Sequence, residues 1–113
     1  MTSKDQPRRR NLSPTKLDEM IEEATVDAYG ESEQNVGFFT LLEERLKLPF
    51  KTEVLGVEVI VERLDMTDDQ QIVAVCSRGK SQQRVSILNL TLPDPPPEGA
   101  EWIEAFRRWA RGR

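Results

Sequence analysis

The sequence predicts an α+β domain in which helices flank a small antiparallel sheet. Apolar residues recur at helical spacing over residues 15–29 and 33–48, and again over 100–110. Between these segments, residues 50–90 contain short runs rich in Val, Ile and Leu with turn residues between them. The chain has 113 residues, which suffices for one domain but not for two ordinary ones. We therefore expect residues 15–113 to form a single domain.

Residues 1–14 are expected to form a disordered basic tail. They carry Lys4, Arg8, Arg9 and Arg10, with few apolar groups to offset the entropy cost of ordering. No hydrophobic stretch follows them, so they do not resemble a secretory signal. No apolar run in the chain approaches the roughly 20 residues that a membrane span needs. We expect a cytoplasmic protein with no membrane partner.

Two consecutive helices are predicted first, as a helical hairpin. Thr15 is the expected N-cap of the first helix, whose apolar face continues to about Tyr29 before Gly30 ends it. The second helix is expected to begin after Ser32 and to end before Pro49. Its apolar face is wide, which indicates deep burial.

Four to five antiparallel strands are predicted next, at a spacing typical of a small curled sheet or an SH3-like barrel. The four clearest cover residues 50–55, 57–64, 71–77 and 84–90. Cys76 lies in one of these apolar runs, which favours a small buried hydrophobe over a reactive thiol.

A proline-rich segment, residues 93–97, is expected to be stiff and extended, and it leads to the last predicted helix. Trp102, Phe106 and Trp109 share one face of that helix. Such aromatic residues could close the core or could stack on nucleic-acid bases. The second alternative needs an interleaved basic groove, which is missing, so we expect a core role.

Composition excludes several classes of chemistry. The chain has no histidine, and Cys76 is its only cysteine. Serine and cysteine triads, thiolate zinc clusters and internal disulfides are therefore excluded. Carboxylate chemistry remains, but nothing in the sequence marks a substrate pocket. We do not expect an enzyme.

Acidic residues dominate the helical half of the chain. No basic residue lies between Lys16 and Arg45. Like charges on neighbouring helical positions repel by a few tenths of a kcal/mol per close pair. A fold tolerates this repulsion because the charges keep the protein soluble, or because a bound cation relieves it. Nine acidic residues occupy this stretch: Asp18, Glu19, Glu22, Glu23, Asp27, Glu31, Glu33, Glu43 and Glu44.

The densest part is residues 26–34, at the joint between the two predicted helices. Asp27 is expected in the last helical turn, Glu31 in the joint and Glu33 at the start of the second helix. Ca²⁺ takes six to eight oxygen ligands, and the last carbonyls of a helix have no internal partner. The negative end of the helix dipole also favours a cation. The same carboxylates could instead stabilise the second helix without any metal.

A second acidic segment, residues 65–69, matches the first positions of an EF-hand loop. Gln70 stands where that loop needs glycine, and Cys76 stands where it needs a bidentate glutamate. We therefore expect a solvated hairpin turn here.

Several short motifs follow one another along the chain, between about Leu17 and Trp109. They are residues 26–34, Gly37-Phe38, Leu48-Pro49-Phe50, residues 56–59 and residues 95–103. In this order they resemble the small bacterial calcium-binding proteins of the CcbP type. The resemblance implies a protein without catalytic activity that binds Ca²⁺ through acidic side chains. It implies Asp27, Glu31 and Glu33 as metal ligands, with Ser32 where the family typically has a third consecutive acid.

These features favour one function over two others. The first is Ca²⁺ binding at the joint by a monomeric cytosolic buffer or sensor, with or without an unidentified protein partner. The alternative is a metal-free protein–protein interaction module that uses the acidic helices or the sheet edge. Nucleic-acid binding is not expected, because the arginines lie at the two ends and the net charge is −4.

Overall fold

The computed structural model describes residues 12–112 and confirms the α+β class. The predicted disordered segment falls mainly on residues 1–11, which lie outside the described residues. Within residues 12–112, no helix is long and apolar enough to cross a membrane. The elements in chain order are α1 (Pro14–Thr25), α2 (Glu31–Arg45), β1 (Phe50–Val54), β2 (Val57–Met66), β3 (Ile72–Arg78), β4 (Ser81–Ser86) and α3 (Glu101–Gly112).

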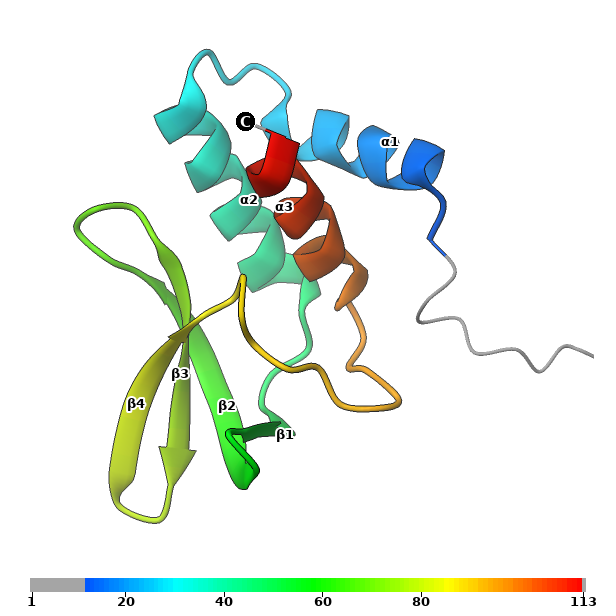
Figure 1. The fold of residues 1–113 in the computed structure, drawn as a ribbon. Coiled ribbons are helices and arrows are strands. Elements are labelled where there is room, and N and C mark those ends of the chain that lie inside the picture. The colour runs from blue at the N-terminus through cyan, green and yellow to red at the C-terminus, as the bar shows by residue number, and fades with distance from the viewer. Residues whose placement is uncertain (1–11, 113) are drawn as a thin grey trace, which may run out of the picture.

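The four strands form one antiparallel sheet in the order β1-β2-β3-β4 (Figure 1). The sheet is open, so β1 and β4 are its two edges. The last strand was predicted to extend to Leu90 but ends at Ser86. The chain turns there, because the Asn89 N–H donates to the Ser86 carbonyl at 2.9 Å. The Arg107 side chain holds this turn through hydrogen bonds to the carbonyls of Ile87 and Leu90.

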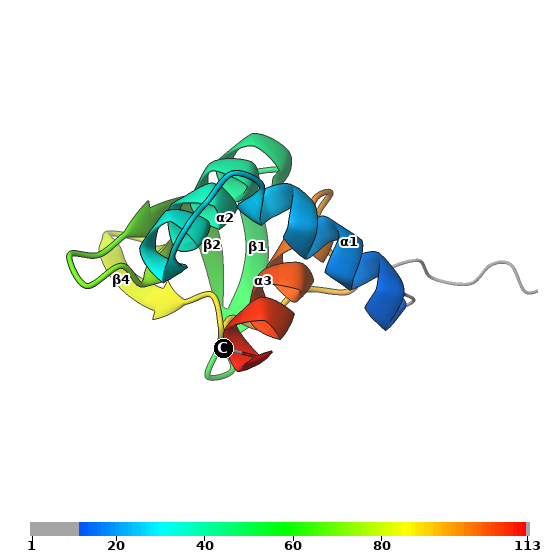
Figure 2. The ribbon, with the colours of Figure 1, turned by 90° about the horizontal axis from the view of Figure 1, so that it is seen from above.

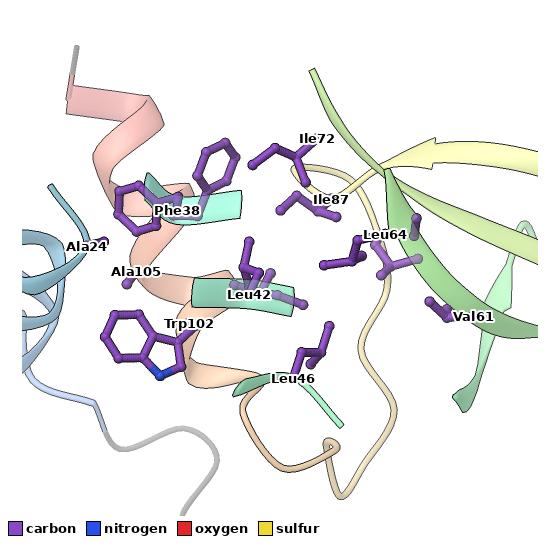
Figure 3. Close-up of a cluster of buried hydrophobic side chains, with 14 of the residues drawn as sticks. Ala24, Phe38, Leu42, Leu46, Val61, Leu64, Ile72, Ile87, Trp102 and Ala105 are labelled. Carbon is purple, nitrogen blue, oxygen red and sulfur yellow. The ribbon is translucent and has the colours of Figure 1, made fainter. Parts of the chain in front are cut away.

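The core lies between the sheet and the helices (Figure 3). Phe38 and Leu42 of α2 are fully buried and contact side chains from the sheet and from α3. Trp102 and Phe106 are also buried, which confirms the predicted core role of the last helix. Cys76 is buried too, and burial raises the pKa of its thiol, as expected for a structural hydrophobe.

Aromatic rings and one glycine fix how the three helices pack. The rings of Phe38, Phe106 and Trp109 form a cluster with centroids 5.3–5.6 Å apart, which joins α2 to α3. Helix α1 lies across the other two (Figures 1 and 2). It approaches α2 so closely at Gly37 that a Cβ there would lie 2.2 Å from the Ala24 carbonyl oxygen.

The predicted boundaries of the first two helices need correction. Ser13, not Thr15, caps α1, and its hydroxyl accepts from the Lys16 N–H at 3.1 Å. Pro14 follows as the first helical residue, where its missing N–H costs nothing. Helix α1 ends at Thr25 rather than near Tyr29, and α2 begins at Glu31 rather than after Ser32.

Candidate functional site

The joint between α1 and α2 consists of residues 26–30. Val26 is already extended, with φ −60° and ψ 135°, and the Ala28 N–H donates to the Thr25 carbonyl at 3.1 Å. Asp27 has φ 62°, a left-handed conformation that aspartate adopts more readily than most residues. The prediction that Asp27 occupies the last helical turn is therefore wrong. Its exposed side chain lies two residues beyond the helix, in the turn that reverses the chain.

Two predicted ligands lie in the first turn of α2. Gly30 is the N-cap and offers no side chain, Glu31 is the first helical residue and Glu33 is the third. The Glu33 carboxylate accepts a hydrogen bond from the Tyr29 N–H at 2.8 Å. This bond satisfies a backbone donor just before the helix, and carboxylates in a first turn also complement the helix dipole. Glu33 thus has the metal-free structural role that the sequence left open.

The start of α2 contacts the turn between β2 and β3, residues 67–71. The Gln70 side-chain amide donates to the Ser32 hydroxyl at 2.8 Å. The Asn35 side-chain amide donates to the Gln70 carbonyl at 2.6 Å. The predicted hairpin turn at the second acidic segment is confirmed. The two acidic segments, which are separate in sequence, therefore lie side by side.

A pocket of about 340 Å³ lies at this contact. Glu31 and Asp69 both line it, together with Asn35 and Gln70. Sequence reasoning missed Asn35, which is only 8% exposed. Its one detectable signal was an amide among the apolar residues of the predicted second helix, because a buried amide needs a partner.

The rest of the acidic stretch is partly neutralised by basic residues from outside it. Arg45, at the end of α2, contacts the Glu23 carboxylate at 3.2 Å. Arg108 of α3 contacts the Asp18 carboxylate at 2.8 Å, and this hydrogen bond holds the pKa of Asp18 below its ordinary value. Two of the nine acids are therefore used to fasten α1 to α2 and α3. The candidate ion site consists of three of the other seven acids, the ones at the joint.

The donor chemistry of the joint suits a hard cation. Asp27, Glu31 and Glu33 supply only oxygen, the ligand atom that Ca²⁺ and Mg²⁺ prefer. In the part of the chain from 12 to 112, however, no three acidic or cysteine side chains form a group able to hold a metal ion. The joint thus provides suitable ligand atoms on adjacent segments, without a preassembled cage.

Comparison with known protein families agrees with this chemistry. A family model of the CcbP type, described as calcium binding, matches residues 18–110. The match covers most of the chain, including α1 from Asp18 onward, the whole of α2 and the sheet, and nearly all of α3. The chain therefore belongs to this calcium-binding family, which confirms the resemblance found in the sequence. The comparisons with curated proteins and with solved structures gave no match.

Proposed function

We propose that the protein binds Ca²⁺ at the joint between α1 and α2 and acts as a cytosolic calcium buffer or sensor. Asp27, Glu31 and Glu33 are the proposed ligands. The main support is membership of a calcium-binding family, since the matched region includes all three of these acidic residues. The protein would work by binding, with no catalytic step.

Three features of the joint would allow it to close around an ion. Val26 is 67% exposed and Tyr29 is 86% exposed, so moving the joint would disturb little buried surface. The last carbonyls of α1 precede Asp27 closely in the chain, and the carbonyls at a helix end lack helical partners, so they could supplement the carboxylates. Glu33 can keep its bond to the Tyr29 N–H with one oxygen while the other contacts the ion.

The ion itself would draw the carboxylates together and relieve their mutual repulsion. Because ordering the joint costs free energy, we expect affinity in the weak range of calcium sites, about 10⁻⁵ to 10⁻³ M. A flexible set of carboxylates and carbonyls also favours Ca²⁺ over Mg²⁺, which demands near-octahedral geometry and gives up its waters reluctantly.

Calorimetric titration of the full chain with Ca²⁺, and with Mg²⁺ as the control ion, tests the proposal directly. At a hundredfold excess over Kd, Ca²⁺ should stabilise the folded state by about 2.7 kcal/mol, which raises the melting temperature. Mg²⁺ should raise it much less. Identical melting curves with Ca²⁺ and with chelator would refute calcium binding.

Asp27→Asn tests whether the joint is a defined site. Asparagine also tolerates a positive φ, so the turn should fold as before. We expect at least a tenfold loss of Ca²⁺ affinity, which corresponds to about 1.4 kcal/mol. Glu19→Gln, which changes an exposed acid on α1, is the matched control and should alter affinity far less, because an exposed charge is screened over roughly 8–10 Å. Equal small losses would indicate diffuse attraction without a site.

Asp69→Asn extends the same test to the neighbouring turn. Asp69 and Glu31 line one pocket, so a second ligating segment would come from the turn between β2 and β3. A loss comparable to that of Asp27→Asn would add this turn to the site. A loss no larger than that of Glu19→Gln would restrict the site to the joint.

A further inference from the structure

The two edges of the sheet differ in how they are protected. Beside β1, the Thr52 hydroxyl donates to the Thr91 carbonyl, so the segment that follows the sheet lies along this edge. On the other side, β4 pairs only with β3 in the part of the chain that the structure describes, and its residues 81–84 are exposed. Figure 1 shows β4 as the outermost strand. The β4 edge is thus available to another strand.

The geometry of the hairpin shows which backbone groups face outward. Gly79 and Lys80 form a two-residue turn, with Gly79 at φ 58°. Arg78 and Ser81 flank such a turn as a hydrogen-bonded pair, so the next pair, Ser77 and Gln82, is not hydrogen-bonded. Because the pattern alternates, Gln82 and Arg84 point their N–H and C=O groups away from β3. These groups could accept one more strand.

The usual protections of an edge strand are weak in β4. Natural edges carry proline, free lysine, bulges or a covering loop. No proline or lysine occurs within β4, and its register with β3 has no bulge. The one charged side chain on this strand, Arg84, lies 3.3 Å from the Asp65 carboxylate of β2 and so turns toward the sheet.

The charge of this hairpin is the opposite of that of the joint. No acidic residue occurs between Asp69 and Asp94, whereas Arg78 and Lys80 lie in that stretch and are exposed. The charge of Arg84, by contrast, is balanced by Asp65. The turn of the hairpin lies at the far end of the sheet from the joint (Figure 1). A partner with acidic side chains would therefore be attracted to β4 and not to the helices.

We propose that the β4 edge is a docking site for an extended, acidic segment of another protein, which adds to the sheet as a further strand. Backbone hydrogen bonds to β4 would supply much of the affinity, and the exposed cations would select the sign of the partner's charge. This site does not depend on the calcium site, because it uses neither residues of the joint nor the turn between β2 and β3.

The probe is a fluorescein-labelled peptide of alternating glutamate and valine, which favours an extended conformation, followed by fluorescence polarisation with the full chain in chelator. A peptide of alternating lysine and valine is the charge control. The glutamate peptide should bind at least tenfold more tightly than the lysine peptide, and its affinity should fall as salt is added. Equal affinities, or no binding of either peptide, would overturn the proposal.

Variants then locate the site. Gln82→Pro removes an outward N–H without breaking the ladder to β3, and it should abolish binding while circular dichroism confirms the fold. Lys80→Glu should weaken binding at least tenfold. Lys51→Glu, an exposed lysine on the opposite edge, is the matched control and should leave the affinity within about twofold. Full binding by Gln82→Pro, or an equal loss in Lys51→Glu, would contradict docking at β4.

Sedimentation of the free protein separates this partner from a second copy. A monomer at the concentrations used for the peptide supports the proposal. A dimer that Gln82→Pro dissociates would show that β4 pairs with itself, which would overturn it.

Discussion

The middle and the first turn of helix α2 lie in very different surroundings. Its middle contributes Phe38 and Leu42, both fully buried, to the core with the sheet and α3. Its first turn meets the joint, where Tyr29 is 86% exposed and the carboxylates of Glu31 and Glu33 are exposed as well. One helix thus links the buried core of the molecule to an exposed joint.

This contrast, taken with the proposed site, leads us to expect that stability and ion binding are carried by different residues. The core holds α2 in place, so its first turn can present carboxylates from a fixed support while residues 26–30 stay free to adjust. Low local stability is typical of segments that move when a ligand binds. Changes in the core should therefore alter the free energy of unfolding, and changes in the joint should alter Ca²⁺ affinity with little effect on the fold.

The largest expected effect is the loss of stability caused by a substitution in the core. Phe38→Ala removes a fully buried ring that contacts Phe106 and Trp109, and it should lower the free energy of unfolding by about 3–5 kcal/mol. Tyr29→Ala removes an aromatic ring from the joint and should cost about 0.5 kcal/mol or less. Urea unfolding followed by tryptophan fluorescence measures both. Similar costs for the two would show that the joint is packed as well as the core.

The next effect concerns the contact of α1 with α2. Gly37→Ala should destabilise the protein by about 3 kcal/mol, because the new methyl group would lie 2.2 Å from the Ala24 carbonyl oxygen and force the helices apart. Gly30→Ala is the matched control, since nothing lies within 4 Å of its Cβ position and its φ is extended. We expect a loss of about 1 kcal/mol or less there, because alanine is a poorer N-cap than glycine. Thermal melts compare the two, and equal losses would contradict the close packing.

A smaller effect is expected where the joint meets the sheet. Asn35→Ala leaves the Gln70 carbonyl without the donor that now lies 2.6 Å away, and this should cost about 2 kcal/mol. Ser32→Ala removes only an exposed acceptor for the Gln70 amide and should cost less than half as much. Amide hydrogen exchange of residues 67–71 should speed up in Asn35→Ala. Unchanged exchange would show that the turn holds its position without α2.

Much of the fold followed from local periodicity in the sequence, whereas the surroundings of the site did not. The alternating apolar runs predicted β1 to β3, and helical spacing predicted the burial of Trp102 and Phe106. The end of α1 was predicted too late, because Ala28 continues the helical pattern although the backbone leaves the helix at Val26.

The contact between Asn35 and Gln70 was beyond sequence reasoning for another reason. The rest of α2 and two strands lie between them in the chain, and only the way α2 packs on the sheet brings them together. Periodicity predicts which residues are buried but not which neighbour they meet. The three proposed ligands could be named from local charge density and the family resemblance, whereas the proximity of Asp69 to Glu31 required the tertiary structure.

The smallest expected effect concerns the ion pair between Asp18 and Arg108, which holds α1 against α3. Arg108 of α3 donates to the Asp18 carboxylate, and this bond lowers the pKa of Asp18 in the folded state. A carboxyl whose pKa is lower when folded adds stability above its unfolded pKa, and the protein loses that stability as the pH falls through the folded pKa. Stability should therefore decline slightly in acid, and Asp18→Asn should flatten that part of the profile.

Urea unfolding across the acid range measures this decline. The partner variant Arg108→Gln should flatten the profile as well, and the double variant should add nothing further. The effect should be small, because both side chains are exposed and solvent screens the pair. Asp18 and Arg108 line one pocket with Glu31, but neither lies in residues 26–30. Ca²⁺ affinity at neutral pH should therefore fall far less in Asp18→Asn than in Asp27→Asn. A loss of Ca²⁺ affinity as large as that of Asp27→Asn would show that the ion site depends on how α1 is anchored, and the two regions would then not be separable.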